Sequence, residues 1–308
     1  MRRLLAVAGL LLALLAAGCG GEESQSGGVE EAASARESQP IRIGTKNFTE
    51  QYILGELYRQ ALESAGFRVE LKRDIGSSEI VHHALIAGSL DMYPEYIGVL
   101  LSEVAEEHER PRDARAAYRR AKAYEEENGF TLLEMTPFSD SNAIAVTEAY
   151  ARRHGVDAIT DLRRAAGGAV TIGAPPEFRT RYEGQVGLQR EYGLEDIVVR
   201  PMRIGAQYQA LDRGTVDAAA IFTTDGQLAA RRYVLLDDPK LLFAAQHVAP
   251  VIDRKVLDAH GPRLAQTIDR VSRRLTTRAM REMNAAVDID GEEPAAVAER
   301  FLVERELL

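Results

Sequence analysis

Two stretches of this chain repeat the same order of apolar, glycine and acidic residues. ALIAGSLD (84–91) recurs as ALDRGTVD (210–217), an offset of 126 residues from 84 to 210. In each copy the glycine suits the left-handed position after a helix, and the apolar residues beside it predict a buried parallel strand. A second pair, IGTKNF (43–48) and IGAPPEF (172–178), opens each half of the chain alike. Helix, glycine and strand are common in any α/β protein, but two echoes together favour two similar α/β lobes.

The residues after each predicted strand are the first candidates for a binding site. YPEY (93–96) follows the first strand, and FTTDG (222–226) follows the second. Open α/β sheets bind their ligands at the carboxyl ends of strands. We therefore expect both segments to face a ligand. Asp91 and Asp217 occupy equivalent places, which suits a structural role in two turns better than a catalytic pair.

A strand, a polar loop and a helix are predicted at the start of the first half. Ile41–Gly44 is a short β-type run, and apolar residues recur at helical spacing over 53–62. Asn47 and Glu50 have the spacing of a capping box. The loop would place Lys46 at the amino end of the helix, where free N–H groups and the helix dipole suit a carboxylate or a phosphate. A solvated Lys46 fits these residues equally well.

The first residues indicate export. Arg2 and Arg3 precede an apolar run over 4–17, which is short for a membrane span and leads through small residues to Cys19, the single cysteine of the chain. This pattern resembles a bacterial lipobox, which implies that residues 1–18 are a signal peptide and that the thiol of Cys19 carries a lipid. A lipidated cysteine leaves no thiol for disulfides, metals or catalysis.

Residues 19–40 predict a flexible tether. They are rich in Gly, Ser and Glu and contain one β-branched apolar residue, Val29, so they cannot form a core. The protein would then lie outside the cytoplasm, anchored to the cell membrane by its N-terminal lipid. Ala16 stands where Leu is commoner in a lipobox, so a plain secretory signal followed by an unmodified cysteine stays open.

Composition and motifs argue against nucleic acid, metals and common catalytic sites. The chain has 38 basic and 47 acidic residues, a net charge of −9, and no basic block. His82 and His83 are neighbours, so on a helix they point about 100° apart and cannot bind one metal ion from one face. The sequence has no P-loop, G-x-S-x-G or H-E-x-x-H motif. We expect no metal site and no cofactor.

Several ordered segments resemble one family of binding proteins. They are GTKNFTEQYILGELY (44–58), AGSLDMYPEYIG (87–98), PPEFRTRYEG (175–184), YQALDRGTVDAAAIFTTDG (208–226) and APVI (249–252). Over nearly its whole length after Ile41, the chain is similar to the glycine betaine, carnitine and choline binding lipoproteins of bacterial ABC importers.

The resemblance implies an α/β fold of two lobes, the type II periplasmic-binding-protein fold, with the ligand in the cleft between the lobes. Lobe 1 would comprise residues 41–143 and 248–308, and lobe 2 residues 144–247, joined by two crossovers. Such a protein would act as a monomer and dock onto permease subunits in the membrane. It would bind a small quaternary ammonium or zwitterionic osmoprotectant and perform no catalysis.

The resemblance also implies a binding site. An aromatic box suits a quaternary ammonium, which cannot donate hydrogen bonds, and cationic side chains suit a carboxylate. Lys46 and Arg181 would hold the carboxylate, Arg181 with both arms of its guanidinium. The remaining positions would be the aromatic residues Tyr93, Tyr96, Tyr208 and Phe222, the backbone carbonyl of Asp140, and Asn142. For each aromatic residue, packing in a core or between lobes is the alternative.

Some positions depart from the family pattern. Asn142 replaces a cage tyrosine, Ile97 and Val99 replace threonines, and Phe222 lacks the hydroxyl of its usual counterpart. An aromatic face is worth about 0.5–2 kcal/mol to a cation, so one lost face lowers affinity by up to about thirtyfold. These departures leave open whether the ligand is a weakly bound betaine or a more polar solute.

Two other classes of function stay open, because fold alone does not determine function. An enzyme on this fold would use carboxylates such as Asp91, Glu95 and Asp225 as acid and base. A sensor would need an output module, which a separately encoded partner could supply.

Overall fold

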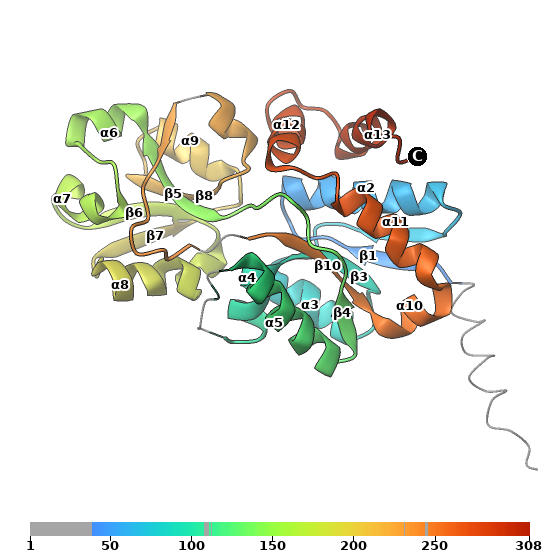
Figure 1. Ribbon diagram of the computed structural model, residues 1–308. Coiled ribbons are helices and arrows are strands. Elements are labelled where there is room, and N and C mark those ends of the chain that lie inside the picture. The colour runs from blue at the N-terminus through green and yellow to red at the C-terminus, as the bar shows by residue number, and fades with distance from the viewer. Residues whose placement is uncertain (1–38, 108–110, 112, 231, 244–245) are drawn as a thin grey trace, which may run out of the picture.

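The protein is built around two five-stranded sheets, each at the centre of one lobe (Figure 1). The computed structural model describes residues 39–107, 111, 113–230, 232–243 and 246–308. The predicted signal peptide, Cys19 and nearly all of the predicted tether lie outside the described residues. In the part of the chain that is described, no helix is long and apolar enough to cross a membrane.

The first lobe contains the sheet β2-β1-β3-β10-β4. Its strands are β1 (Ile41–Gly44), β2 (Val69–Lys72), β3 (Met92–Tyr96), β4 (Phe130–Leu132) and β10 (Val248–Asp253). β1 pairs in parallel with β2 and β3, and β10 runs antiparallel to β3 and β4. Strands from both ends of the chain therefore form one sheet.

The second lobe repeats this order in the sheet β7-β6-β8-β5-β9. Its strands are β5 (Asn142–Thr147), β6 (Val170–Ala174), β7 (Ile197–Pro201), β8 (Ala218–Phe222) and β9 (Tyr233–Leu235). The strand that enters from the other lobe, β5 here and β10 in the first sheet, is antiparallel in both. The chain crosses between the lobes twice, after β4 and after β9. The predicted boundary after residue 143 falls inside β5.

Helices cover both faces of each sheet, as Figure 1 shows. Those of the first lobe are α2 (Thr49–Ser64), α3 (Ser78–Ile86), α4 (Ile97–Val99), η1 (Leu100–Val104), α5 (Ala114–Glu127), α10 (Arg254–His260), α11 (Pro262–Ser272), α12 (Thr277–Asp288) and α13 (Pro294–Glu304). α2, α11 and α13 pack on one face of the sheet, and α3 and α5 on the other. α12 contacts both α2 and η5 of the second lobe, so it lies between the lobes.

The second lobe has shorter helices. They are α6 (Glu148–His154), η2 (Ile159–Asp161), α7 (Leu162–Ala166), η3 (Pro176–Arg179), η4 (Tyr182–Val186), α8 (Gly187–Tyr192), α9 (Ala206–Asp212) and η5 (Gly226–Ala230). α9 packs against β8, as α3 packs against β3 in the first lobe.

The predicted echo corresponds to the same structural unit in each lobe. Gly88 and Gly214 have φ angles of 69° and 64°, the left-handed conformation that glycine adopts without strain. Asp91 Oδ2 accepts a hydrogen bond from the backbone N–H of Arg42, and Asp217 Oδ2 accepts one from Thr171, both at 2.8 Å. Each aspartate therefore joins the turn before one strand to the neighbouring strand, the structural role that the sequence predicts.

The predicted capping box at α2 is wrong. Phe48 is the N-cap residue, and no side chain caps the helix. The carboxylate of Glu50 is held elsewhere, because it accepts hydrogen bonds from Tyr96, Thr224 and Asn284. Partners remote in sequence have displaced a local hydrogen bond that sequence spacing alone predicted.

Glu125 of α5 is a buried acid without a hydrogen bond. Its side chain is 0% exposed, and neither carboxylate oxygen has a hydrogen-bond partner in the described part of the chain. His82 lies beside it, with Nδ1 3.7 Å from Oε1 of Glu125 and 3.1 Å from the Tyr93 hydroxyl, and burial lowers the pKa of His82. Burial, and then the negative charge of Glu95, raise the pKa of Glu125 to about 8.

We expect Glu125→Gln to stabilise the protein at pH 8 by about 4 kcal/mol and to change little at pH 4.5. In the unfolded chain the carboxyl ionises near pH 4.5, whereas in the folded chain it stays protonated to about pH 8. The folded state therefore loses stability as pH rises between these values, and glutamine removes that loss. Urea denaturation at both pH values measures it, with the exposed Glu127→Gln on the same helix as the control. An equal effect at both pH values would contradict this account.

Candidate ligand-binding cleft

Three aromatic rings form a stack from one lobe to the other. Phe48, at the amino end of α2, lies 6.1 Å from Tyr96 and 5.1 Å from Phe222 between ring centroids. The interplanar angles are 24° and 28°, so the rings are stacked. Tyr96 is the last residue of β3 and Phe222 the last residue of β8, whereas the sequence predicted that both follow their strands. The stack brings both lobes to a shared cleft.

A small space of about 40 Å³ lies beside this stack, and we call it the aromatic cavity. Among its lining residues are most of the positions predicted from the sequence: Lys46, Tyr96, Asp140, Asn142, Arg181 and Phe222. Phe48, Ser77, Ser78, Val99, Glu177, Ile204, Gln246 and Asn47 complete the lining. The structure therefore gathers residues that are up to about 200 positions apart in sequence around one cavity.

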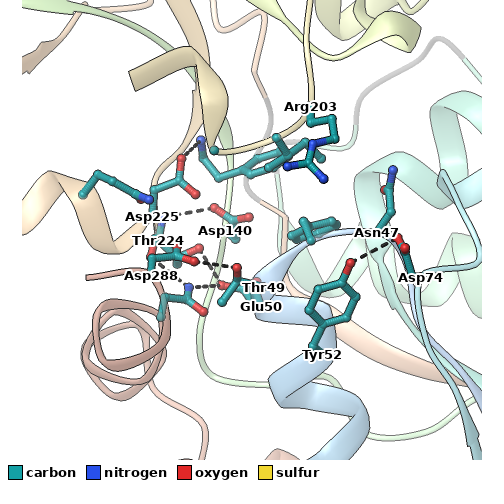
Figure 2. Close-up of a pocket in the computed structure, with 16 residues that line it drawn as sticks. Asn47, Thr49, Glu50, Tyr52, Asp74, Asp140, Arg203, Thr224, Asp225 and Asp288 are labelled. Atoms are coloured by element: carbon teal, nitrogen blue, oxygen red, sulfur yellow. Dashed lines mark hydrogen bonds between the residues drawn. The ribbon is translucent and has the colours of Figure 1, made fainter. Parts of the chain in front are cut away.

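A larger space of about 290 Å³ adjoins the aromatic cavity, and we call it the acidic cavity (Figure 2). It shares Asn47, Phe48, Asp140, Ile204 and Phe222 with the aromatic cavity. The charged residues in its lining are Glu50, Asp74, Asp140, Asp225, Asp288 and Arg203. No group of His, Cys, Asp and Glu side chains in the described residues has an arrangement that could hold a metal ion.

Lys46 is buried and ion-paired. Its ammonium contacts Oε1 of Glu95 and lies 4.2 Å from the centroid of the Tyr96 ring. The two side chains are 4% and 0% exposed. Burial lowers the pKa of Lys46, and the charge of Glu95 opposes that shift. The sequence predicted the place of this cation but not its carboxylate partner.

Arg181 joins the second lobe to the first. Its Nη2 lies 2.8 Å from Oε2 of Glu79 on α3, and its Nε lies 3.2 Å from Oε1 of the same carboxylate. Glu103 lies further away, at 4.0 Å from Nε. Burial alone would raise the pKa of Glu79, but the hydrogen bond and charge of Arg181 outweigh burial and hold this pKa at about 2. Glu79 is therefore ionised at neutral pH.

Two aspartates of the cleft are tied to the loop after β8. Asp140 Oδ1 accepts hydrogen bonds from Thr223 Oγ1 and from the Thr224 backbone, both at 3.2 Å. Asp225 Oδ2 accepts from the Tyr208 hydroxyl at 2.7 Å and from the Phe222 backbone at 3.0 Å. Burial raises the pKa of Asp140 well above its usual value and that of Asp225 to about 7. A cation in the cleft would favour their ionised forms.

Asn142, which stands where the resemblance to the family led us to expect a tyrosine, is part of a polar cluster. Its Nδ2 donates to Oε2 of Glu183 at 3.1 Å, and Nε2 of Gln246 donates to the same oxygen at 3.0 Å. Glu183 is 5% exposed. The amide therefore solvates a buried carboxylate at the edge of the aromatic cavity, where a tyrosine would present a ring.

The structure does not bring Tyr93 and Tyr208 to the lining of either cavity. Side chains alternate along β3, so Tyr93 points away from Tyr96 into the core beneath α3 and α5, where its hydroxyl meets His82. Tyr208 packs edge-on against Tyr233, at 4.9 Å between centroids, and its hydroxyl reaches Asp225. Both tyrosines are at most 3% exposed.

Sequence reasoning missed other residues of the cleft. Phe48 could have been predicted from the sequence, because it is an aromatic residue two positions after Lys46 on the same predicted loop. Glu79, Glu183 and Gln246 carried no signal in the sequence, since their relevance depends on contacts with residues of distant segments.

The arrangement defines a class of protein. Two similar lobes enclose adjoining cavities, and both lobes contribute rings and charged side chains to them. Ligands between the lobes of such a protein are held by contacts that domain closure completes. The arrangement is that of a two-lobe binding protein with its cavities between the lobes.

The family follows from comparison with known proteins. Residues 39–304 match the family described as the substrate binding domain of ABC-type glycine betaine transport systems, and the chain belongs to this family. It is 33% identical over 287 residues to the glycine-betaine-binding protein of Pseudomonas aeruginosa, which covers 90% of this chain and 91% of that protein. It is 28% identical over 267 residues to the carnitine transport binding protein OpuCC of Listeria monocytogenes, covering 85% of each.

A solved structure described as a glycine betaine/carnitine/choline ABC transporter has the same fold. Its TM-score is 0.69 at 28% identity, and the alignment covers 87% of this chain and 99% of that chain. These comparisons confirm the predicted family and the two-lobe α/β fold. The chain is thus a substrate-binding protein of an ABC-type transport system.

Proposed function

We propose that this protein is the lipid-anchored, extracytoplasmic binding subunit of an ABC importer, and that its ligand is a small quaternary ammonium compound. Its mechanism is closure rather than catalysis. A ligand that contacts both lobes stabilises the closed form, and the permease distinguishes that form from the open one. The subunit acts as a monomer.

The aromatic stack is the observation that carries this proposal. Tyr96, Phe48 and Phe222 line a cavity to which both lobes contribute, and Phe48 stacks on the other two rings. A quaternary ammonium cannot donate hydrogen bonds, so aromatic faces and nearby carboxylates are the groups that attract it. Asp140 supplies such a carboxylate at the junction of the two cavities. The names of the relatives, which include glycine-betaine and carnitine binding proteins, support the same class of ligand.

Thermal unfolding in the presence of candidate ligands tests the proposal. The protein from residue 39 is heated with glycine betaine, proline betaine, carnitine, choline, ectoine or common amino acids, since the chain has no Trp to report binding by fluorescence. A ligand at a hundred times its Kd stabilises the folded state by about 2.7 kcal/mol. We expect a concentration-dependent rise in Tm for a quaternary ammonium compound. A rise for an amino acid alone would refute this ligand class.

For the anchor, we expect Cys19→Ser to release the full-length protein from the membrane fraction. Cys19 is the single cysteine, so the substitution removes the one thiol that a lipid could modify. Fractionation of cells that express each form, with immunoblotting of membranes and medium, measures the release. Retention of the serine variant in membranes would count against lipidation at this residue.

A further inference from the structure

The two predicted rings of the aromatic cavity are stacked on another ring of the protein. Phe48 lies 6.1 Å from Tyr96 and 5.1 Å from Phe222 between ring centroids, with interplanar angles of 24° and 28°. The ammonium of Lys46 also lies 4.2 Å from the centroid of the Tyr96 ring. Because a π face attracts a cation only where the two can touch, a ligand competes with these internal partners for both rings.

The aromatic cavity is too small for the ligand that its lining suits. Its volume of about 40 Å³ leaves room for about three water molecules, and a trimethylammonium group alone is larger. Cavities that hold small molecules measure about 300–1,000 Å³. The adjoining acidic cavity has about 290 Å³, and Phe48 lines both cavities. A site of sufficient size therefore needs the two cavities to join, and the Phe48 ring lies where they meet.

The Phe48 ring can leave the stack by rotation of its side chain. The backbone is held in place, because the Phe48 carbonyl accepts hydrogen bonds from the backbone N–H groups of Gln51 and Tyr52 at 3.1 and 3.2 Å. The side chain has no polar atom, so its rotation breaks no hydrogen bond. The residue is half-buried and borders the acidic cavity, which is large enough for a phenyl ring. The cost of the rotation is therefore the loss of the two stacking contacts.

We propose that Phe48 is an internal competitor of the ligand, whose ring turns into the acidic cavity when a quaternary ammonium group binds between Tyr96 and Phe222. This inference rests on the proposed function, since the group that displaces the ring is the cation of the ligand. Only molecules whose Phe48 ring has turned away are competent to bind, so the apparent Kd is the intrinsic Kd divided by their fraction. A ring that were a fixed wall of the site would instead add to the affinity.

Two substitutions of Phe48 distinguish a competing ring from a fixed wall. Phe48→Ala removes the ring and Phe48→Trp enlarges it, so the second variant keeps the test decisive if the first does not fold. Calorimetric titration of choline, glycine betaine and carnitine gives the Kd for each form of the protein from residue 39. Phe67→Ala is the matched control, because Phe67 follows α2 as Phe48 precedes it, and both are partly buried against the same core.

We expect Phe48→Ala to tighten the binding of a quaternary ammonium compound by about fivefold or more, because stacking on two rings no longer competes with the ligand. Phe48→Trp should weaken the binding of the same compound, because a larger ring stacks over a wider area. Phe67→Ala should leave its Kd unchanged.

The opposite signs would overturn the inference. Weaker binding by Phe48→Ala, with binding by Phe48→Trp kept or tightened, shows that Phe48 is a fixed wall and leaves the proposed function intact. Unchanged Kd values in both variants show that the ring neither competes nor contributes, and they also overturn the inference. If none of the three compounds binds to the unmodified protein or to Phe48→Ala, the proposed function itself fails, and this inference fails with it.

Discussion

Glu50→Ala is expected to lower the free energy of unfolding by about 3 kcal/mol. Glu50 is 3% exposed and accepts hydrogen bonds from the Tyr96 hydroxyl at 2.7 Å, Thr224 Oγ1 at 2.6 Å and Asn284 Nδ2 at 3.0 Å. Removing the acceptor leaves three buried donors without it, and each unsatisfied buried group costs about 1–3 kcal/mol. Water from the adjoining acidic cavity offsets part of this cost, which is why the expected loss is below the sum.

The contacts of Glu50 also explain why its loss should affect more than one lobe. Tyr96 ends β3 of the first lobe, Thr224 follows β8 of the second, and Asn284 lies on α12 between them. Asn284 Nδ2 additionally donates to the backbone carbonyl of Thr224 at 2.9 Å. Glu50 therefore holds together three segments that meet at the cleft.

Urea denaturation followed by circular dichroism measures the effect of Glu50→Ala. Glu63→Ala, on the same helix, is the control, because Glu63 is 41% exposed and makes a surface ion pair with Arg59 worth about 0.5 kcal/mol. Glu50→Gln keeps one acceptor oxygen and should fall between the two. A loss below about 1 kcal/mol for Glu50→Ala would show that the three donors find other partners.

The fold was predictable where the signal is local. The two helix-glycine-strand patterns correctly predicted that Gly88 and Gly214 are left-handed. The aspartates at the ends of the two patterns make the same kind of hydrogen bond to the neighbouring strand. The capping box failed for the opposite reason, since Glu50 has the right spacing but better partners in segments that sequence spacing does not relate to it.

The site was predictable where residues end strands or resemble the family. Tyr96, Phe222 and Lys46 meet in the cleft because Tyr96 and Phe222 are the last residues of β3 and β8 and Lys46 follows β1 by two positions. Tyr93 is three residues from Tyr96, and the alternation of side chains along a strand puts it on the other face. The resemblance to the family identified the segment that contains Tyr93. The direction in which each side chain points depends on the register of the strand, which the resemblance does not give.

The pairing of charges was beyond sequence reasoning. Glu79 and Arg181 are 102 positions apart and belong to different lobes, so their contact exists only when the lobes approach. No pattern of spacing relates the two residues. The same is true of Glu183, Asn142 and Gln246, whose cluster joins both crossings between the lobes.

Phe222→Leu is expected to weaken binding of a quaternary ammonium ligand by about twofold to thirtyfold, with little change in the free energy of unfolding. Phe222 is half-buried, lines both cavities and stacks on Phe48 at 5.1 Å. Leucine nearly fills the same volume but has no π face, and an aromatic face contributes about 0.5–2 kcal/mol to binding a cation. The loss should therefore come from the ligand's charge rather than from packing.

Calorimetric titration separates charge from packing. Choline and 3,3-dimethyl-1-butanol, its neutral carbon analogue, are titrated into the protein, Phe222→Leu and Phe222→Tyr. Tyrosine keeps the face and should keep the affinity for choline within about threefold. Phe67→Leu, which removes a ring far from the cleft beside His260, should change neither Kd. If Phe222→Leu weakens the neutral analogue as much as choline, the ring acts by packing alone, and the aromatic stack is not a site for a cation.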